Sequence, residues 1–106
     1  MKFIKKSYQL LTKELINILI NVKDHIKDDS DLTWVYYETP DDIRIEIDKY
    51  ITELEKGKVA FLDEIYTHFL PTAAYQEHSI ANNWSTEYQE IAKQFDKIYE
   101  ALKKYD

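Results

Sequence analysis

Apolar residues recur every three or four positions at the start of the chain, a spacing that places side chains on one face of an α-helix. The predicted helix runs from Phe3 to about Lys27. Its inward stripe consists of Ile4, Tyr8, Leu11, Leu15, Ile18, Leu19, Val22 and Ile26. Phe3, Leu10, Ile16 and Ile20 lie off that stripe. A helix that is apolar on several sides is typical of the centre of a bundle or of pairing with another chain.

A second helix is predicted where Thr39-Pro40-Asp41-Asp42 provides a cap, a proline for the first turn and acids for the positive end of the helix dipole. It ends at Lys56-Gly57, because glycine commonly follows the last helical residue. Its stripe consists of Ile43, Ile47, Tyr50, Ile51 and Leu54.

Residues 28–31 (Asp-Asp-Ser-Asp) predict a loop between these helices, since Asp and Ser side chains compete for local backbone bonds. The segment Leu32 to Tyr37 is aromatic and β-branched. It fits a short extended piece or a further helical turn, and the sequence does not decide between them.

A third helix is predicted from about Lys58 to Phe69, with an inward stripe of Val59, Leu62, Ile65, Tyr66, Phe69 and Leu70. Pro71 ends it, because the residue before a proline disfavours helical geometry. Residues 72–83 have weak periodicity and are interpreted as a connection containing about one helical turn. The last helix runs from about Ser85 to Lys104, with a stripe of Trp84, Tyr88, Ile91, Ala92, Phe95, Ile98, Tyr99 and Leu102.

These patterns predict an all-α fold: an irregular four-helix bundle with a loop or short extended piece after the first helix, in one domain over residues 1–106. The composition agrees with this prediction. One glycine and two prolines leave few turns for a multi-stranded sheet. A hydrophobic fraction of 44% is ample for a packed core.

The chain has no cysteine, which excludes disulfides and thiolate zinc sites. Its first residues are basic, but Gln9, Thr12, Lys13 and Glu14 interrupt the apolar residues that follow. A signal peptide or a membrane span needs an unbroken apolar run. We therefore expect a cytoplasmic protein that does not bind a membrane.

The net charge of −6 is unevenly distributed. Residues 1–23 hold five Lys and one Glu, whereas residues 24–64 hold thirteen acidic and five basic side chains. Nucleic-acid backbones are bound by Lys and Arg, so an acidic chain is not expected to bind them. A basic protein is the expected partner, because complementary charge accelerates association.

Candidate catalytic chemistry is sparse. Glu64 and His68 are one helical turn apart and could reach a common metal ion, but a metal site normally needs three or four ligands. The alternative is a solvent-facing pair with no ligand. The acidic pairs 28–29, 41–42 and 63–64 lie where loops and first helical turns favour acids. No nucleophile motif or glycine-rich phosphate loop accompanies them. We expect neither an enzyme nor a bound cofactor or metal.

Ile45 lies nearly opposite the apolar stripe of the second helix, among Asp41, Asp42, Asp48 and Lys49. An apolar centre inside a charged rim is the layout of a protein-binding hot spot. The alternative is an isolated exposed hydrophobic residue, which is common on protein surfaces. The sequence thus predicts partner contact at Asp41, Asp42, Ile45 and Asp48.

Aromatic residues provide further candidates. Trp34, Tyr36 and Tyr37 could anchor a partner, because Trp and Tyr are enriched in hot spots, or could close one end of the core. Trp84 and Tyr88 lie on the inner stripe of the last helix, and Trp84 is assigned to the core. Ile16 and Ile20 could form a self-association surface or lie beneath residues 32–37.

The C-terminal third carries a pattern of Leu-Pro-Thr (70–72), Gln-Glu-His-Ser-Ile (76–80), Asn-Asn-Trp (82–84) and Phe-Asp (95–96). It resembles a segment of small bacterial proteins, some of which are similar to immunity proteins that accompany secreted toxins. Ala73-Ala74 departs from the glycine-containing turn of that pattern. The acidic helical outline is also similar to immunity proteins of colicin-type nucleases, whose motifs are absent. The resemblance implies no catalytic residues.

The leading hypothesis is therefore a non-enzymatic immunity or antitoxin-type protein that binds and occludes a basic partner. The second is a homo-oligomerising structural or adaptor bundle that associates through Ile16 and Ile20. A third is a metal-dependent enzyme that uses Glu64, His68 and a distant ligand.

Overall fold

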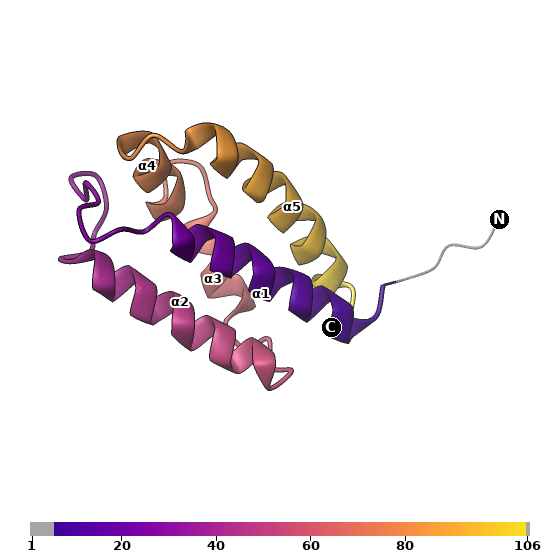
Figure 1. Ribbon diagram of the computed structural model, residues 1–106. Coiled ribbons are helices and arrows are strands. Elements are labelled where there is room, and N and C mark those ends of the chain that lie inside the picture. The colour runs from indigo at the N-terminus through magenta and orange to yellow at the C-terminus, as the bar shows by residue number, and fades with distance from the viewer. Residues whose placement is uncertain (1–5, 106) are drawn as a thin grey trace.

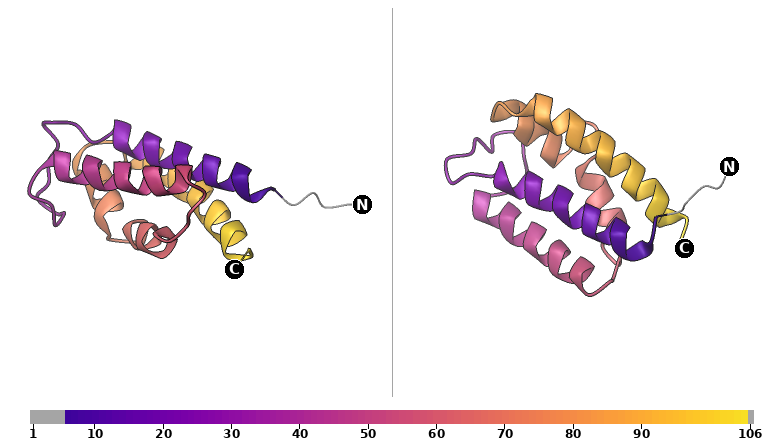
Figure 2. Two further views of the ribbon diagram at one scale, coloured as in Figure 1. Left: turned by 90° about the horizontal axis from the view of Figure 1, so that it is seen from below. Right: turned by 45° about the vertical axis from the view of Figure 1, so that its right-hand side comes forward.

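The computed structural model describes residues 6–105, which form five α-helices and no β-strand. The helices are α1 (Tyr8–Asp24), α2 (Pro40–Glu55), α3 (Leu62–His68), α4 (Ala74–Ala81) and α5 (Ser85–Lys103). Figure 1 shows α1 lying between α2 and α5, and Figure 2 shows α3 and α4 on one side of that row. The all-α prediction is confirmed, whereas the count of four helices is wrong.

The first helix begins at its cap. The Ser7 hydroxyl accepts a hydrogen bond from the Leu10 amide at 3.1 Å, which satisfies a backbone donor that the helix itself leaves free. The predicted start at Phe3 lies outside the described residues. The helix ends at Asp24, three residues before the predicted end, and Ile26 is nevertheless buried.

The second helix has the predicted boundaries at both ends. The Thr39 hydroxyl accepts from the Asp42 amide and the Asp42 carboxylate accepts from the Thr39 amide, each at 3.2 Å, which makes a reciprocal capping box. At the other end Gly57 has φ 75°. Its amide donates to Leu54 O at 2.9 Å, and the Lys58 amide donates to Glu53 O at 3.0 Å. These two bonds form a Schellman motif.

The third helix is shorter than predicted, since residues 58–61 are not helical and a turn at residues 60–61 precedes Leu62. Leu70, predicted to face inward, is 38% exposed because it follows the end of this helix. The larger error concerns residues 72–83. They contain α4, a helix of 8 residues, rather than a connection with a single turn.

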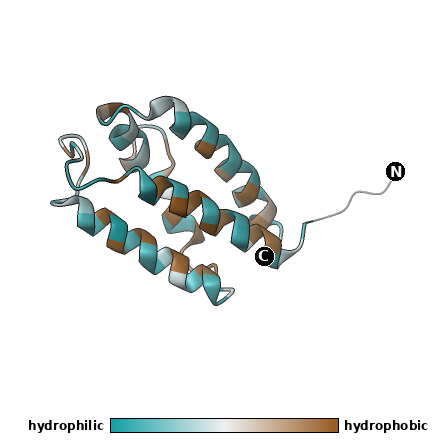
Figure 3. Cartoon of the chain, in the orientation of Figure 1, coloured by the Kyte–Doolittle hydropathy of each residue, from teal (hydrophilic) through white to brown (hydrophobic). Residues whose placement is uncertain are grey.

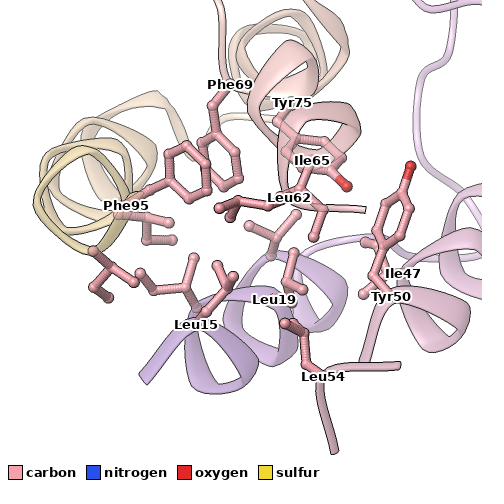
Figure 4. Close-up of a cluster of buried hydrophobic side chains, with 14 of the residues drawn as sticks. Leu15, Leu19, Ile47, Tyr50, Leu54, Leu62, Ile65, Phe69, Tyr75 and Phe95 are labelled. Carbon is pink, nitrogen blue, oxygen red and sulfur yellow. The ribbon is translucent and has the colours of Figure 1, made fainter. Parts of the chain in front are cut away.

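The core lies where the helices converge (Figure 4). Phe95 of α5 stacks on Phe69 with ring centroids 4.1 Å apart. Leu15 and Leu19 of α1 are fully buried beside them. Trp84 is 4% exposed, so its assignment to the core is confirmed. Hydrophobic residues also appear on the outer side of α1, among polar ones (Figure 3).

Candidate functional site

The loop between α1 and α2 is irregular but held in place. Residues 32–35 form a turn in which the Val35 amide donates to Leu32 O at 3.1 Å. The Asp31 amide donates to Asn82 Oδ1 at 2.7 Å, and Asn82 Nδ2 donates to Asp31 O at 2.9 Å. These bonds attach the loop to the end of α4. The segment that the sequence left undecided is thus neither a strand nor a helix.

This loop exposes two large aromatic side chains. Trp34 is 70% exposed and Tyr36 is fully exposed, whereas Val35 and Tyr37 between and beside them are half-buried. The alternation turns every second side chain outward. Burying an aromatic side chain normally stabilises a fold by a few kcal/mol, about 25 cal/mol per Å² of apolar surface. Trp34 and Tyr36 forgo most of that stabilisation.

A pocket of about 420 Å³ lies beneath the loop. One wall is the loop itself, another comes from α2 and α3, and the third comes from the segment before α4. Its lining residues are Trp34, Val35, Tyr36, Tyr37, Glu46, His68, Thr72, Ala73 and Ala74. The loop, the second helix and the start of α4 therefore meet at one concave, largely aromatic site.

A chain of hydrogen bonds runs from this pocket toward the core. The Tyr37 hydroxyl donates to Glu46 Oε1 at 2.6 Å, and His68 Nε2 lies 3.2 Å from the same oxygen. The Tyr50 hydroxyl donates to Glu64 Oε2 at 2.5 Å and lies 2.9 Å from His68 Nε2. Because the single Tyr50 proton points to Glu64, a proton on His68 Nε2 completes the remaining contacts.

The protonation states of the hydrogen-bonded groups Glu46, Tyr37 and Tyr50 follow from burial and hydrogen bonding. Burial alone would raise the pKa of Glu46, but hydrogen bonds from His68 and Tyr37 outweigh it, and the pKa falls below its ordinary value. Glu46 is thus a carboxylate at neutral pH. Burial, followed by hydrogen bonds to Glu46 and Glu64, raises the pKa of Tyr37 and Tyr50. Both phenols remain donors.

Tyr75 lies next to this series of hydrogen bonds, on its core side. The residue is 1% exposed, and its hydroxyl has no hydrogen-bond partner among residues 6–105. Figure 4 shows this hydroxyl directed toward the side of the core where Tyr50 lies. Burial, with the nearby Tyr50 and Tyr37 oxygens and Glu46, raises the pKa of Tyr75. An unpaired buried hydroxyl costs about 1–3 kcal/mol, so this side of the core is polar and incompletely satisfied.

The Tyr50 hydroxyl contacts both Glu64 and His68, so the side chains of the predicted pair meet at this residue. Glu64 is exposed, whereas the His68 side chain is only 17% exposed, so one member of the pair faces solvent and the other is half-buried. Within residues 6–105 no group of three or more His, Asp or Glu side chains is arranged to hold a metal ion. The metal-dependent reading gains no support from the described residues.

The acidic face of α2 is arranged as the helical spacing predicts, and Ile45 is 62% exposed. Its acids are, however, already engaged. Asp41 pairs with Arg44 at 2.9 Å, and Asp48 pairs with Lys23 of α1 at 2.7 Å. Asp42 caps the helix through its bond to Thr39. Part of the predicted negative charge is therefore balanced within the chain.

The remaining predicted surface is on α1, where Ile20 is 42% exposed and Ile16 is half-buried against the core. Residues 34–37 line the pocket over Glu46 and His68 instead. The alternative in which residues 32–37 cover Ile16 and Ile20 is not supported at Ile20, which stays exposed.

The sequence missed Glu46 and Tyr50 as site residues. Tyr50 lies on the apolar stripe of the second helix, and Glu46 is one of many acids in residues 24–64. The available signal was their spacing of one helical turn, which places a carboxylate next to a phenol on the same side of α2.

No helix in residues 6–105 is long and apolar enough to cross a membrane. No protein family, curated protein or solved structure matches this chain. The resemblance to immunity-type proteins stays a prediction.

Proposed function

We propose that this protein is a non-enzymatic binding module that holds a basic protein partner against the loop between α1 and α2 and the outer face of α2. The loop contributes Trp34 and Tyr36, with Tyr37 beneath them. The helix contributes Ile45 inside its rim of Asp41, Asp42 and Asp48. In the immunity-type hypothesis the partner is a toxin, and binding occludes the surface through which the toxin acts.

The exposure of Trp34 and Tyr36 on an anchored loop is the observation that carries the proposal. Trp and Tyr are the residue types most enriched in binding hot spots. A loop that is already fixed loses little conformational entropy on binding, which strengthens association. The bonds between Asp31 and Asn82 supply that fixation at one end, and the Thr39–Asp42 capping box supplies it at the other.

The charge of the region supports a basic partner. Residues 24–64 carry thirteen acidic and five basic side chains. The exposed carboxylates that remain around the loop and α2 favour a partner with a basic surface, because complementary charge steers association and disfavours acidic competitors. A cytoplasmic location is part of this proposal.

The double variant Trp34→Ala, Tyr36→Ala tests the proposal. Both side chains are exposed, so stability should change by less than about 1 kcal/mol. Affinity for the partner should fall at least about 100-fold, since hot-spot truncations cost about 2 kcal/mol or more each. The measurement is calorimetric titration against the purified product of the gene adjacent to this one in the native host.

Ile80→Ala is the matched control, because Ile80 is also a large exposed hydrophobic residue, 57% exposed, but lies on α4. It should bind like the wild type. Ile45→Glu with Asp41→Lys and Asp48→Lys should abolish binding through the helix face. Absence of binding by the wild-type protein, or unchanged affinity in both the loop and the helix variants, would refute the proposal.

A homo-oligomerising bundle is the alternative function. Leu10 and Ile20 on the outer side of α1 are 44% and 42% exposed, with half-buried Ile16 beside them. Such a surface could pair two copies of the chain. The oligomeric state separates the two functions.

A further inference from the structure

The pocket beneath the Trp34–Tyr37 loop differs in charge from other hollows on the surface. Glu46 is the one carboxylate among its lining residues within 6–105, and neither Lys nor Arg lines it. The groove between α1 and α5 is lined by Lys6, Glu14 and Lys97, so its acid already has cations nearby. In the aromatic pocket, therefore, no lysine or arginine side chain lines the wall beside Glu46.

Glu46 has one oxygen available to a ligand. Its Oε1 accepts the hydrogen bonds from Tyr37 and His68. Its Oε2 accepts no hydrogen bond from residues 6–105, and the Glu46 side chain is 28% exposed. Lys49, one turn along α2, extends over the Phe61 ring at 4.5 Å instead of pairing with Glu46.

The walls of the pocket suit a flat cation. One side of the pocket is lined by the aromatic residues Trp34, Tyr36 and Tyr37. Aromatic faces attract cations, and the planar guanidinium of arginine also stacks on them. Arginine is more weakly hydrated than lysine, so it loses less when it enters a partly closed site. A volume of about 420 Å³ leaves room for the long arginine side chain.

We propose that this pocket receives a single arginine side chain of the basic partner, with the guanidinium donating to Glu46 Oε2 and stacking on the aromatic wall formed by Trp34 and Tyr36. This inference rests on the proposed function and assigns Glu46 as its specificity-determining residue. The charge-assisted bond supplies selection for a cation, and the stacking supplies selection for arginine over lysine.

The first experiment uses the wild-type protein and N-acetyl-arginine N-methylamide, with the lysine and citrulline analogues as comparisons. Citrulline has nearly the shape of arginine but no charge. The indole N–H resonance of Trp34 reports binding in an NMR titration, and that of buried Trp84 is the internal reference. The arginine analogue should bind at least about tenfold more tightly than the citrulline analogue. Equal binding of arginine and citrulline, equal binding of arginine and lysine, or no shift at Trp34 would overturn the inference.

The second experiment uses Glu46→Gln, which keeps the side-chain shape and can still accept from Tyr37. It should remove the preference for arginine over citrulline. Glu55→Gln is the control, because Glu55 is an exposed acid at the end of the same helix and away from the pocket. It should retain the preference.

Titration of the variants with the partner distinguishes failure of the arginine inference from failure of the proposed function. If Trp34→Ala, Tyr36→Ala loses the partner while Glu46→Gln binds it normally, the proposed function stands and the arginine inference fails. If both variants lose affinity and Glu55→Gln does not, both stand. If neither variant loses affinity, the arginine inference fails, and the proposed function fails with it when the helix variant Ile45→Glu, Asp41→Lys, Asp48→Lys also binds like the wild type.

Discussion

His78 is a histidine enclosed by the core. It is 1% exposed, and its Nδ1 accepts the indole N–H of Trp84 at 2.9 Å. The ring proton therefore resides on Nε2, which has no hydrogen-bond partner within residues 6–105. Burial, with a smaller contribution from His25, lowers the pKa of His78 from 6.5 to about 4. The folded protein thus keeps this side chain neutral.

The stability of the fold should consequently fall as the pH falls from 6.5 to about 4. Within that window the unfolded chain binds a proton at His78 and the folded chain does not, so protonation favours unfolding. The loss should approach about 3 kcal/mol across the window and be absent above it. Urea unfolding at a series of pH values measures it.

His78→Gln is the comparison, because glutamine can accept from Trp84 without titrating. The difference in unfolding free energy between the two proteins should depend on pH over this window. Asp31, which also faces His78, has a pKa below its ordinary 3.8 because Thr33 donates to it, so it titrates below the window. A pH-independent difference would contradict the assignment of a neutral, buried His78.

At the scale of the element, α2 and α4 differ in whether local sequence signals define the helix. The capping box, Pro40 and the Schellman glycine of α2 are local, so its sequence is sufficient to define its ends. In contrast, α4 has no side-chain hydrogen bond from its N-cap residue, Ala73. Its buried face consists of Tyr75, His78 and Ser79. Two of these three residues are polar, so the sequence shows no apolar stripe that would predict the helix.

Gly57 provides a test of local specification. Its φ of 75° lies in the left-handed region, where a side chain is strained, yet a Cβ there would meet nothing within 4 Å. Gly57→Ala should therefore destabilise the protein by about 1 kcal/mol through the backbone alone, and Gly57→Asn by less. Thermal or urea unfolding measures both. Equal stability of the alanine variant and the wild type would argue against this helix end.

At the scale of the whole molecule, the uneven charge of the chain becomes a contact between helices. Lys23 of the basic first segment pairs with Asp48 of the acidic second helix, 2.7 Å apart. The Arg44 guanidinium binds Asp28 and Asp41 and also donates to Ile26 O. These bonds fasten the start of the α1–α2 loop to α2, so part of the acidity stabilises the site rather than facing a partner.

The oligomeric state is the prediction at this scale. If the outer side of α1 pairs two chains, the sedimentation coefficient of the wild type should rise with concentration, and Ile20→Glu should remove that rise without unfolding the protein. A wild-type monomer at high concentration would exclude the oligomerising alternative. The Trp34→Ala, Tyr36→Ala variant should behave like the wild type in this measurement, since its loop lies over the pocket.

The sequence by itself determined the all-α class, the ends of α2 and the stripes of α1 and α5. Each depends on interactions within about one helical turn: side-chain spacing, capping bonds and backbone preference. The exposure of Ile45 and the burial of Trp84 follow from the same spacing. The sequence also indicated the loop aromatics as candidates, but it could not decide whether they point outward.

Only the tertiary structure decided α4 and the pocket. His78 and Ser79 are buried although both are polar: the Ser79 hydroxyl donates to Gln76 O within α4, and His78 Nδ1 accepts from the Trp84 indole, which lies beyond the end of the helix. Glu46 is part of a site because Tyr37, nine residues earlier, and His68, far beyond it, converge on one of its oxygens. Contacts between distant residues leave no periodic pattern in the sequence, and they separate this carboxylate from the many solvated acids around it.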